Sequence, residues 1–488
     1  MRALLLLILL VIPLMSRTHG APVFNDFFID ATMRVDYYHT GNSADEIITV
    51  DRIYRQGIWA GSTKNLVDEF NNGRYYAKIY DAKTGTLIYS RGFDSYFGEY
   101  KLSDEALKGI KRTYHESVLI PWPKAPVLFT LEVRDRQNRL QRFFETQIDP
   151  EDISIIKDRV SDAAVKVIES YRSGDPHTKA DIVILGEGYT AKETAKFESD
   201  LKKFTGVFFS QEPYRSYRNS FNIYGVLKPS EESGCDEPDR GTFRNTALNT
   251  TFNSLGSERY LLTEDNRTMR DLAAHVPYDA IYIMVNHNRY GGGGIYNLFC
   301  TFTTDNQWYE YLFLHEFGHS FAGLADEYYT SDVAYNEFYP KGIEPVEPNI
   351  TALAGGAELK WKDKISKGID IPTPWEKANY DSSDYAYQKI RRELNSQIAD
   401  AKRSGAPKRE TDILETEAER LSREHADRAD EYLHKSRYWG KVGAYEGAGY
   451  AAQGLYRPML DCIMFSKGKK PFCRVCEDAI VRVIKHYE

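Results

Sequence analysis

Apolar and polar side chains alternate along the first part of the chain, which is the pattern of strands buried on one face. Residues 74–80 alternate in this way and return through 86–89 after a turn, and residues 127–133 return through 140–148. Short alternating runs separated by turn residues are typical of antiparallel two-sheet folds. We therefore predict a β-sandwich N-terminal domain over residues 21–150, serving as an adaptor or as a wall beside the substrate.

Beyond residue 150 the pattern changes to buried strands separated by helical periodicity. The predicted elements are a helix at 153–171, strands at 181–185, 221–226 and 278–285, and a helix at 191–208. Strands that alternate with helices indicate an α/β or α+β domain. We predict one such domain over residues 151–488, so that the chain as a whole has an α+β fold.

A densely charged stretch at residues 384–437 interrupts this second domain. Apolar residues recur at helical spacing between residues 387 and 398, and a Gly- and Pro-containing break at 404–407 precedes a second helical series. This pattern predicts an inserted antiparallel helical hairpin with a mostly solvated surface. An arm that docks a partner is the functional alternative.

The N-terminus has the order of features found in an export signal. Arg2 precedes an apolar run at residues 4–15, and small and polar residues lead to Gly20 and Ala21. This order predicts a signal peptide at residues 1–20 and a secreted, periplasmic or cell-surface protein. An uncleaved anchor is the alternative, but the run is short for a bilayer, and no other apolar run is long enough to span a membrane.

Composition supports a sizeable core and argues against one class of partner. The chain is 42% hydrophobic and 13% aromatic, with a formal charge of −8 that becomes more negative when Arg2 and Arg17 leave with the signal. A nucleic-acid partner normally requires a basic face, and no run of Lys and Arg provides one. Nucleic acid is therefore not an expected partner.

Five cysteines are present, at positions 235, 300, 462, 473 and 476. Disulfides are permitted in an exported protein, and the odd number leaves at least one thiol unpaired or intermolecular. We expect a structural disulfide among Cys462, Cys473 and Cys476. The Cys473-x-x-Cys476 pair could instead be half of a zinc knuckle or a redox motif, although no second CxxC or thioredoxin-like context accompanies it.

The strongest chemical signal is the motif His315-Glu316-Phe317-Gly318-His319. Its upstream flank is apolar and aromatic, which predicts a packed helix, and Gly323 is placed to end that helix. His315 and His319 would lie one turn apart on one face, so both imidazoles can reach one zinc ion. Glu316 can then take a proton from the attacking water and pass it to the leaving amine. Two ordinary surface histidines are the alternative.

A carboxylate after the helix is predicted to complete the ligand set. Metzincins use HExxHxxGxxH or the same frame ending in Asp, and Gly323 and Asp326 keep its final spacing, with one extra residue after His319. We choose Asp326 as the third ligand, with Glu327 and a more distant Glu as competitors. The same frame predicts a methionine turn beneath the metal, for which Met464 is the candidate and an ordinary core position is the alternative.

Several segments together resemble the IgA-peptidase family of zinc metallopeptidases, a group related to the metzincins. They read DIVILGEGYT at 181–190, SGCD at 233–236, YGGGGIYN at 290–297, HEFGHSFAGLADEY at 315–328, GAYEGAGY at 443–450 and YRP at 456–458. The resemblance spans about 180–488, and the β-rich region before it looks like the family's N-terminal domain.

The resemblance implies a metzincin-like zinc peptidase domain. It also implies that the two histidines and Asp326 bind Zn²⁺, that Glu316 is the general base, and that Met464 forms a Met-turn. The helical hairpin is not part of these motifs. Immunoglobulin A is not carried over as the substrate, because nothing in the chain encodes recognition of a particular peptide bond.

Two further features are candidates for the site. The run Gly291, Gly292, Gly293 and Gly294 could form a rim that lets a substrate backbone approach closely, or it could be a plain mobile loop. Tyr445 and Tyr456 could donate a hydrogen bond to the oxyanion of the transition state, although packed tyrosines are common in so aromatic a chain.

The favoured function is a secreted zinc-dependent endopeptidase acting on a protein or glycoprotein substrate. A zinc hydrolase that cuts glycoproteins or cell-wall peptide stems is the runner-up. A glycan- or protein-binding exported protein with a structural zinc site is the alternative from another class. The intact Glu316 argues against this last reading, because a structural site has no need for a base. Oligomeric state is left open.

Overall fold

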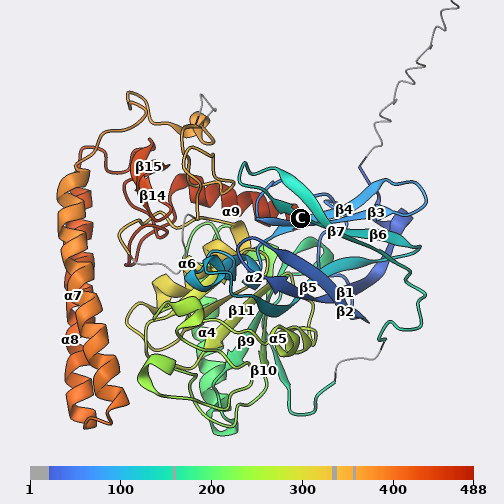
Figure 1. Ribbon diagram of the computed structural model, residues 1–488, viewed down its shortest axis with the longest axis horizontal. Helices are drawn as coiled ribbons and strands as arrows, with labels where there is room; N and C mark the ends of the chain where they lie inside the picture. The colour runs from blue at the N-terminus through green and yellow to red at the C-terminus, as the bar shows by residue number, and fades with distance from the viewer. Residues whose placement is uncertain (1–20, 158–160, 332–337, 355–358) are drawn as a thin grey trace, which may run out of the picture.

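Two antiparallel sheets form the N-terminal part of the molecule (Figure 1). The computed structural model describes residues 21–157, 161–331, 338–354 and 359–488, so the predicted signal peptide lies outside the described residues. The sheets have the orders β2-β1-β5 and β4-β3-β6-β7. Their strands are β1 (Phe28–Gly41), β2 (Glu46–Arg55), β3 (Tyr75–Asp81), β4 (Leu87–Phe93), β5 (Arg112–Pro123), β6 (Val127–Arg134) and β7 (Leu140–Ile148).

Side chains from both N-terminal sheets meet in one apolar core. Val35 of β1, Ile79 of β3 and Phe129 of β6 belong to the same buried cluster. The alternation of the sequence produces this core, because every second residue of a strand points to the same face. Both predicted hairpins are confirmed, since β3 pairs with β4 and β6 pairs with β7. The short helices α1 (Phe24–Phe27), α2 (Tyr96–Tyr100) and α3 (Asp104–Leu107) flank these sheets.

A six-stranded sheet is the centre of the second part and has the order β12-β13-β11-β9-β10-β8. The inner strands run parallel, and the two edge strands pair antiparallel with their neighbours. The strands are β8 (Lys166–Tyr171), β9 (Ala180–Glu187), β10 (Phe221–Leu227), β11 (Ala280–Val285), β12 (Gly292–Ile295) and β13 (Phe299–Thr303). Together with the helices they confirm the predicted α+β class.

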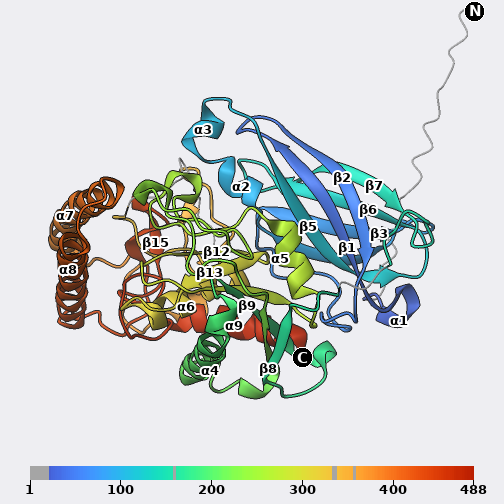
Figure 2. The same cartoon turned by 90° about the horizontal axis from the view of Figure 1, so that it is seen from below.

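Helices cover both faces of the central sheet (Figure 2). One face packs against α4 (Thr194–Ser210), α6 (Tyr309–Ala322) and α9 (Arg474–Tyr487), and the other packs against α5 (Asn266–Ala273). Ile182 and Ile184 of β9 point to the first face, whereas Val183 and Leu185 point to the second. Phe97 of α2 joins the second cluster, so the N-terminal region is packed directly onto the sheet.

The helix predicted at residues 153–171 is wrong. Ile153 is fully exposed in a turn, and the segment ends in strand β8, which pairs antiparallel with β10. The pattern of apolar residues in this segment resembled a helix. Pairing with a distant edge of the sheet overrides it, because Val167 and Ile168 are β-branched and suit a pleated surface.

The inserted hairpin is present, and its first helix begins before the predicted start at residue 384. It consists of α7 (Lys377–Arg403) and α8 (Lys408–His434), and it stands at the opposite end of the molecule from the N-terminal sheets (Figure 1). The chain reverses at residues 404–407, as predicted. Tyr387 and His425 stack across the two helices at 4.0 Å between ring centroids. A small two-stranded sheet of β14 (Tyr445–Ala448) and β15 (Ala451–Arg457) follows.

Across the described segments, no helix combines the length and the apolar character that a membrane crossing requires.

Candidate metal centre

Helix α6 carries the HExxH motif through the core of the second domain. Its residues from Tyr311 to Gly318 are all buried, so the helix is held by packing on several sides. It ends at Gly323, as predicted, with φ at 60° and with the Leu324 N–H donating to the Gly318 carbonyl oxygen. A glycine suits this left-handed position because it has no Cβ to clash. The resulting turn sends the chain back along the helix, which brings Asp326 to the two histidines.

Three donor atoms converge at this point. The Nε2 atoms of His315 and His319 are 3.1 Å apart, and Oδ1 of Asp326 lies 3.0 Å from the first and 3.3 Å from the second. The Nδ1 atoms face the opposite way, towards the carbonyl oxygens of Ile463 at 3.0 Å and Leu324 at 2.6 Å. These backbone contacts fix each ring and leave Nε2 available, which is how metal-binding histidines are usually oriented.

The charge distribution of this cluster suits a cation. Burial favours neutral His319, but the Asp326 carboxylate raises the pKa of His319 to about 9. Burial also opposes ionisation of Asp326, yet the two imidazoles hold the pKa of that carboxyl well below its usual range. Oδ1 of Asp326 makes no hydrogen bond of good geometry within the described residues, despite its short distances to both rings. A buried oxygen of this kind can accept a metal ion.

Glu316 lies beside the three donors at the floor of an open cleft. The cleft has a volume of about 1020 Å³ including its mouth, and all four residues line it. Burial raises the pKa of Glu316 above that of an ordinary glutamate. A carboxylate whose pKa is shifted towards neutrality is better matched to accept and return a proton. Two imidazoles and a carboxylate with one side open to the cleft fit the ligand set of a catalytic zinc site.

The glycine run forms a strand that packs against the motif helix. Gly292, Gly293 and Gly294 belong to edge strand β12 and line the cleft, whereas Gly291 is not among the lining residues. A Cβ at Gly294 would lie 2.9 Å from Cβ of His319, and one at Gly292 would lie 3.1 Å from Cγ of Glu316. The expectation of a plain mobile loop is therefore wrong, because these glycines let a strand and a helix approach closely.

The N-terminal region and the loops complete the wall of the cleft. Gly73, Asp94 and Glu99 come from the N-terminal part of the chain and line the cleft beside residues of the second domain. The N-terminal part of the chain therefore supplies residues to the wall of the same cleft.

Met464 lies in a turn beneath α6 and is fully buried. A Cβ placed on Gly318 would come within 3.0 Å of its sulfur. Its carbonyl oxygen accepts a hydrogen bond from the Glu327 N–H at 2.8 Å. Met464 therefore packs under the helix, and its backbone holds the segment that carries Asp326.

The structure corrects the choice of tyrosines. Tyr445 is fully buried in a separate cluster and donates its hydroxyl to the Lys441 carbonyl oxygen at 3.1 Å. Neither Tyr445 nor Tyr456 is among the described residues that line the cleft. Tyr450 is the tyrosine of this segment that reaches the site, where its hydroxyl donates to Asp326 Oδ2 at 2.6 Å.

Tyr450 has a backbone conformation that the structure reveals and the sequence did not. It is the last residue of the GAYEGAGY motif and has a positive φ of 64°, next to Gly449 with a φ of 54°. A bulky residue in the left-handed region is uncommon and points to a functional constraint. Arg259, whose Nη2 donates to the Tyr328 hydroxyl at 3.0 Å, also lines the cleft and carried no recognisable sequence signal.

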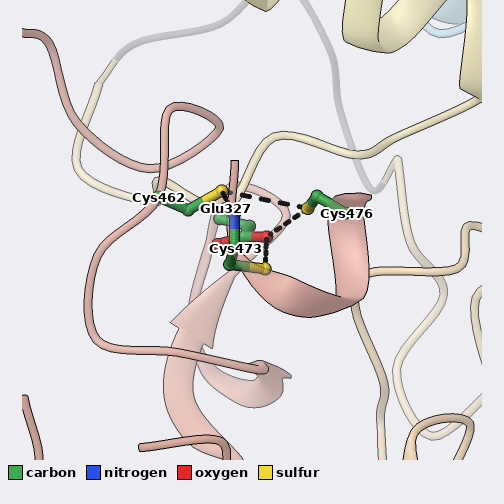
Figure 3. Close-up of side chains that lie close together, drawn as sticks. All are labelled: Glu327, Cys462, Cys473 and Cys476. Atoms are coloured by element: carbon green, nitrogen blue, oxygen red, sulfur yellow. Dashed lines mark hydrogen bonds between the residues drawn. The ribbon is translucent and has the colours of Figure 1, made fainter. Parts of the chain in front are cut away.

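Glu327, the competing third ligand, points away from the histidines. Its carboxylate lies among Cys462, Cys473 and Cys476 (Figure 3). All five cysteines of the chain are free, so the expected disulfide among the last three is wrong. The sulfurs of Cys462 and Cys476 are 3.8 Å apart, far beyond the length of about 2.05 Å of a disulfide bond.

Comparison with known proteins adds two family matches. The family model described as IgA Peptidase M64 matches residues 168–484, and the model described as Peptidase M64 N-terminus matches residues 23–145. A search of curated proteins found no match.

Proposed function

Because the chain belongs to the IgA peptidase M64 family, we propose that it is an exported zinc-dependent endopeptidase. Membership of the family supports a peptidase with a protein substrate. The further assignment is ours: His315, His319 and Asp326 hold Zn²⁺, and Glu316 is the general base.

The convergence of three donor atoms beside Glu316 carries this proposal. Three ligands leave a coordination position free, and that position faces the cleft where a substrate can enter. A structural zinc site is normally closed by a fourth protein ligand. The openness of this cluster therefore favours a catalytic site over the zinc-containing binding protein.

Three residues of the chain have separate roles in the proposed peptide hydrolysis. A bound Zn²⁺ supplies Lewis acidity, which makes water more acidic and polarises the scissile carbonyl. Glu316 accepts the proton of the attacking water and then delivers it to the leaving amine. Tyr450 holds Asp326 in position, and Arg259 places positive charge at the cleft wall, where charge develops on the carbonyl oxygen.

The shape of the cleft supports an extended peptide as the substrate. Edge strand β12 brings backbone without side chains to the rim, where a peptide can approach closely. We interpret the two N-terminal sheets as a β-sandwich that walls this cleft, and the helix, Asp326 and Met464 turn as a metzincin-like arrangement. Residues 1–20 would direct the protein out of the cytoplasm, to the periplasm, the cell surface or the medium.

Replacement of the general base tests the proposal. Glu316→Gln keeps the size of the side chain but cannot accept a proton, so we expect cleavage of a peptide and glycoprotein panel to fall by about 10²–10⁴-fold. Zinc content, measured on the same samples, is expected to be unchanged. Glu310→Gln is the matched control, because Glu310 lies in the first turn of the same helix, where its carboxylate has only long contacts, 3.3 Å from the Tyr309 hydroxyl and 3.5 Å from Lys469.

Three outcomes would count against the proposal. Wild-type protein that binds zinc but cleaves nothing on the panel would favour the binding-protein alternative. Equal cleavage by wild type and Glu316→Gln would remove Glu316 from the mechanism. Wild-type protein without zinc at the histidine cluster would remove the metal.

A further inference from the structure

A second cluster of metal-binding side chains lies behind the candidate metal centre. It consists of Cys462, Cys473, Cys476 and Glu327, all buried, with one donor atom of each within 4.8 Å of the others. The four residues come from three separate segments: the stretch after α6, the Met464 turn and the start of α9 (Figure 3). None of them lines the cleft.

The separations within this cluster match those of a four-coordinate metal site. The Sγ atoms of Cys462 and Cys476 are 3.8 Å apart, and Oε1 of Glu327 lies 3.2 Å from Sγ of Cys476 and 4.0 Å from Sγ of Cys473. Zinc–sulfur bonds of ~2.3 Å and a zinc–oxygen bond of ~2.0 Å in a tetrahedron place sulfurs ~3.8 Å apart and sulfur and oxygen ~3.5 Å apart. These three separations are therefore close to those of a tetrahedral zinc site, and all four donor atoms lie within 4.8 Å of one another.

We propose that Cys462, Cys473, Cys476 and Glu327 form a second, structural zinc site in this protein. Three thiolates and a carboxylate are a soft, tetrahedral donor set, which selects Zn²⁺ over Mg²⁺ or Ca²⁺. All four positions are filled by protein and the cluster is sealed from solvent, so the site has no place for a substrate. The proposal is independent of the catalytic assignment above, because the two sites share no ligand.

The surroundings of the sulfurs favour metal over a plain buried core. Cys473 is the N-cap of α9, and its N–H donates to Sγ of Cys462 at 3.1 Å, a contact that stabilises a thiolate. Cys476 lies in the first turn of the same helix, where the helix dipole also favours negative charge. A purely apolar pocket would offer neither feature.

Glu327 supplies the clearest sign of a missing partner. Its Oε1 accepts a hydrogen bond from Nδ2 of Asn349 at 3.0 Å, which orients the carboxylate towards the sulfurs. Its Oε2 is buried and, in the part of the chain that the structure describes, has no hydrogen-bond partner. A buried carboxylate oxygen without a partner is costly, and a cation bound to the other oxygen, Oε1, would offset the cost of burying this carboxylate.

This second site would brace the first one. The Glu327 N–H donates to the Met464 carbonyl oxygen, and the Ile463 carbonyl oxygen contacts Nδ1 of His315. A metal bound to Glu327 and Cys462 would therefore fix both the segment that ends in Asp326 and the turn that orients His315. Its role is to hold these segments, not to act on the substrate.

Zinc counting with selective removal of each site tests the proposal. Zn²⁺ per chain is measured by plasma mass spectrometry, and its ligands are identified by X-ray absorption at the zinc edge. We expect two equivalents in the wild type and one in His315→Ala/His319→Ala, with that remaining zinc bound mainly by sulfur at ~2.3 Å. Cys473→Ala/Cys476→Ala is expected to lose the sulfur-bound equivalent. Cys235→Ala/Cys300→Ala removes two other buried thiols and is expected to retain both.

The histidine variant keeps the test decisive if the cysteine variant fails to fold. Absence of sulfur-bound zinc from both the wild type and the histidine variant would overturn the proposal. A disulfide between any two of Cys462, Cys473 and Cys476 in the native protein, found by non-reducing peptide mapping, would also overturn it. One equivalent in the wild type, bound mainly by sulfur, would support this second site and contradict the catalytic assignment instead.

Discussion

The two donor clusters each include one of two neighbouring carboxylates, and their surroundings differ. Asp326 faces His315 and His319 at the floor of a cleft of about 1020 Å³, whereas Glu327 faces three cysteines in the sealed core. Because these two neighbouring side chains face different clusters, one short stretch of chain can serve two sites.

The difference between the clusters lies in the number of protein donors and in access. The open cluster has two imidazoles and one carboxylate, which leaves room for a reacting group. The sealed cluster has four donors and no lining position in the cleft. Access to the cleft is therefore the main difference between the two clusters, and the proposed catalytic and structural roles depend on it.

The neighbouring carboxylates give the sharpest test of this comparison. Asp326→Asn is expected to lower cleavage by at least ~100-fold, since even outer partners of a metal ligand cost 10–100-fold, and to leave the free energy of unfolding nearly unchanged. Glu327→Gln is expected to lower the free energy of unfolding by at least ~2 kcal/mol, because loss of a structural metal removes folding energy. Cleavage rates and urea unfolding are measured on both variants.

The two carboxylate variants serve as each other's control. The comparison fails if both variants lose activity without losing stability, or if both lose stability to the same extent. Zinc content separates these cases, because each variant is expected to release one equivalent and to keep the other.

A smaller effect, on zinc affinity, is expected from replacing Tyr450 at the open cluster, with Tyr445 outside the cleft as the control. Tyr450→Phe removes the hydroxyl that donates to Asp326 Oδ2, so we expect zinc affinity at the histidine cluster to fall by about 10–100-fold. Tyr445→Phe removes a hydroxyl that contacts only backbone carbonyl oxygens outside the cleft. Competition with a zinc chelator measures the affinity of each variant, and the same loss in both would show that Tyr450 has no positioning role.

Sequence patterns correctly predicted the structural features that depend mainly on nearby residues. The alternation around residues 74–80 predicted a strand, the apolar flank of HExxH predicted a packed helix, and Gly323 predicted where that helix ends. Each of these follows from spacing within a few residues, so tertiary contacts only reinforce it.

Features that depend on distant segments could not be predicted in the same way. Strand β8 exists because β10 pairs with it, although its own pattern resembled a helix. The Glu327 cluster joins residues 146 positions apart in sequence, and no spacing rule links them. The choice between Tyr445 and Tyr450 depends on a left-handed turn at residues 449–450, which the amino-acid types alone do not specify.

Strand β12, which lines the cleft, should not tolerate side chains in place of its glycines. A Cβ on Gly294 would overlap the Glu316 carbonyl oxygen and lie 2.9 Å from Cβ of His319, so β12 and α6 would have to move apart. We expect Gly294→Ala to lower the free energy of unfolding by about 1–3 kcal/mol, as overpacking does. It should also reduce cleavage, because α6 carries Glu316, while the sulfur-bound zinc remains.

Gly206→Ala is the matched control for this last effect. Gly206 is exposed within α4, and a Cβ there meets no atom within 4 Å. Alanine is the better helix former, so this variant is expected to gain about 0.5–1 kcal/mol of stability without a change in cleavage. Urea unfolding measures the change in stability of both variants. If Gly294→Ala changed neither stability nor cleavage, β12 would be able to move away from α6 without cost. The close contact between β12 and α6 would then not contribute to the open cluster.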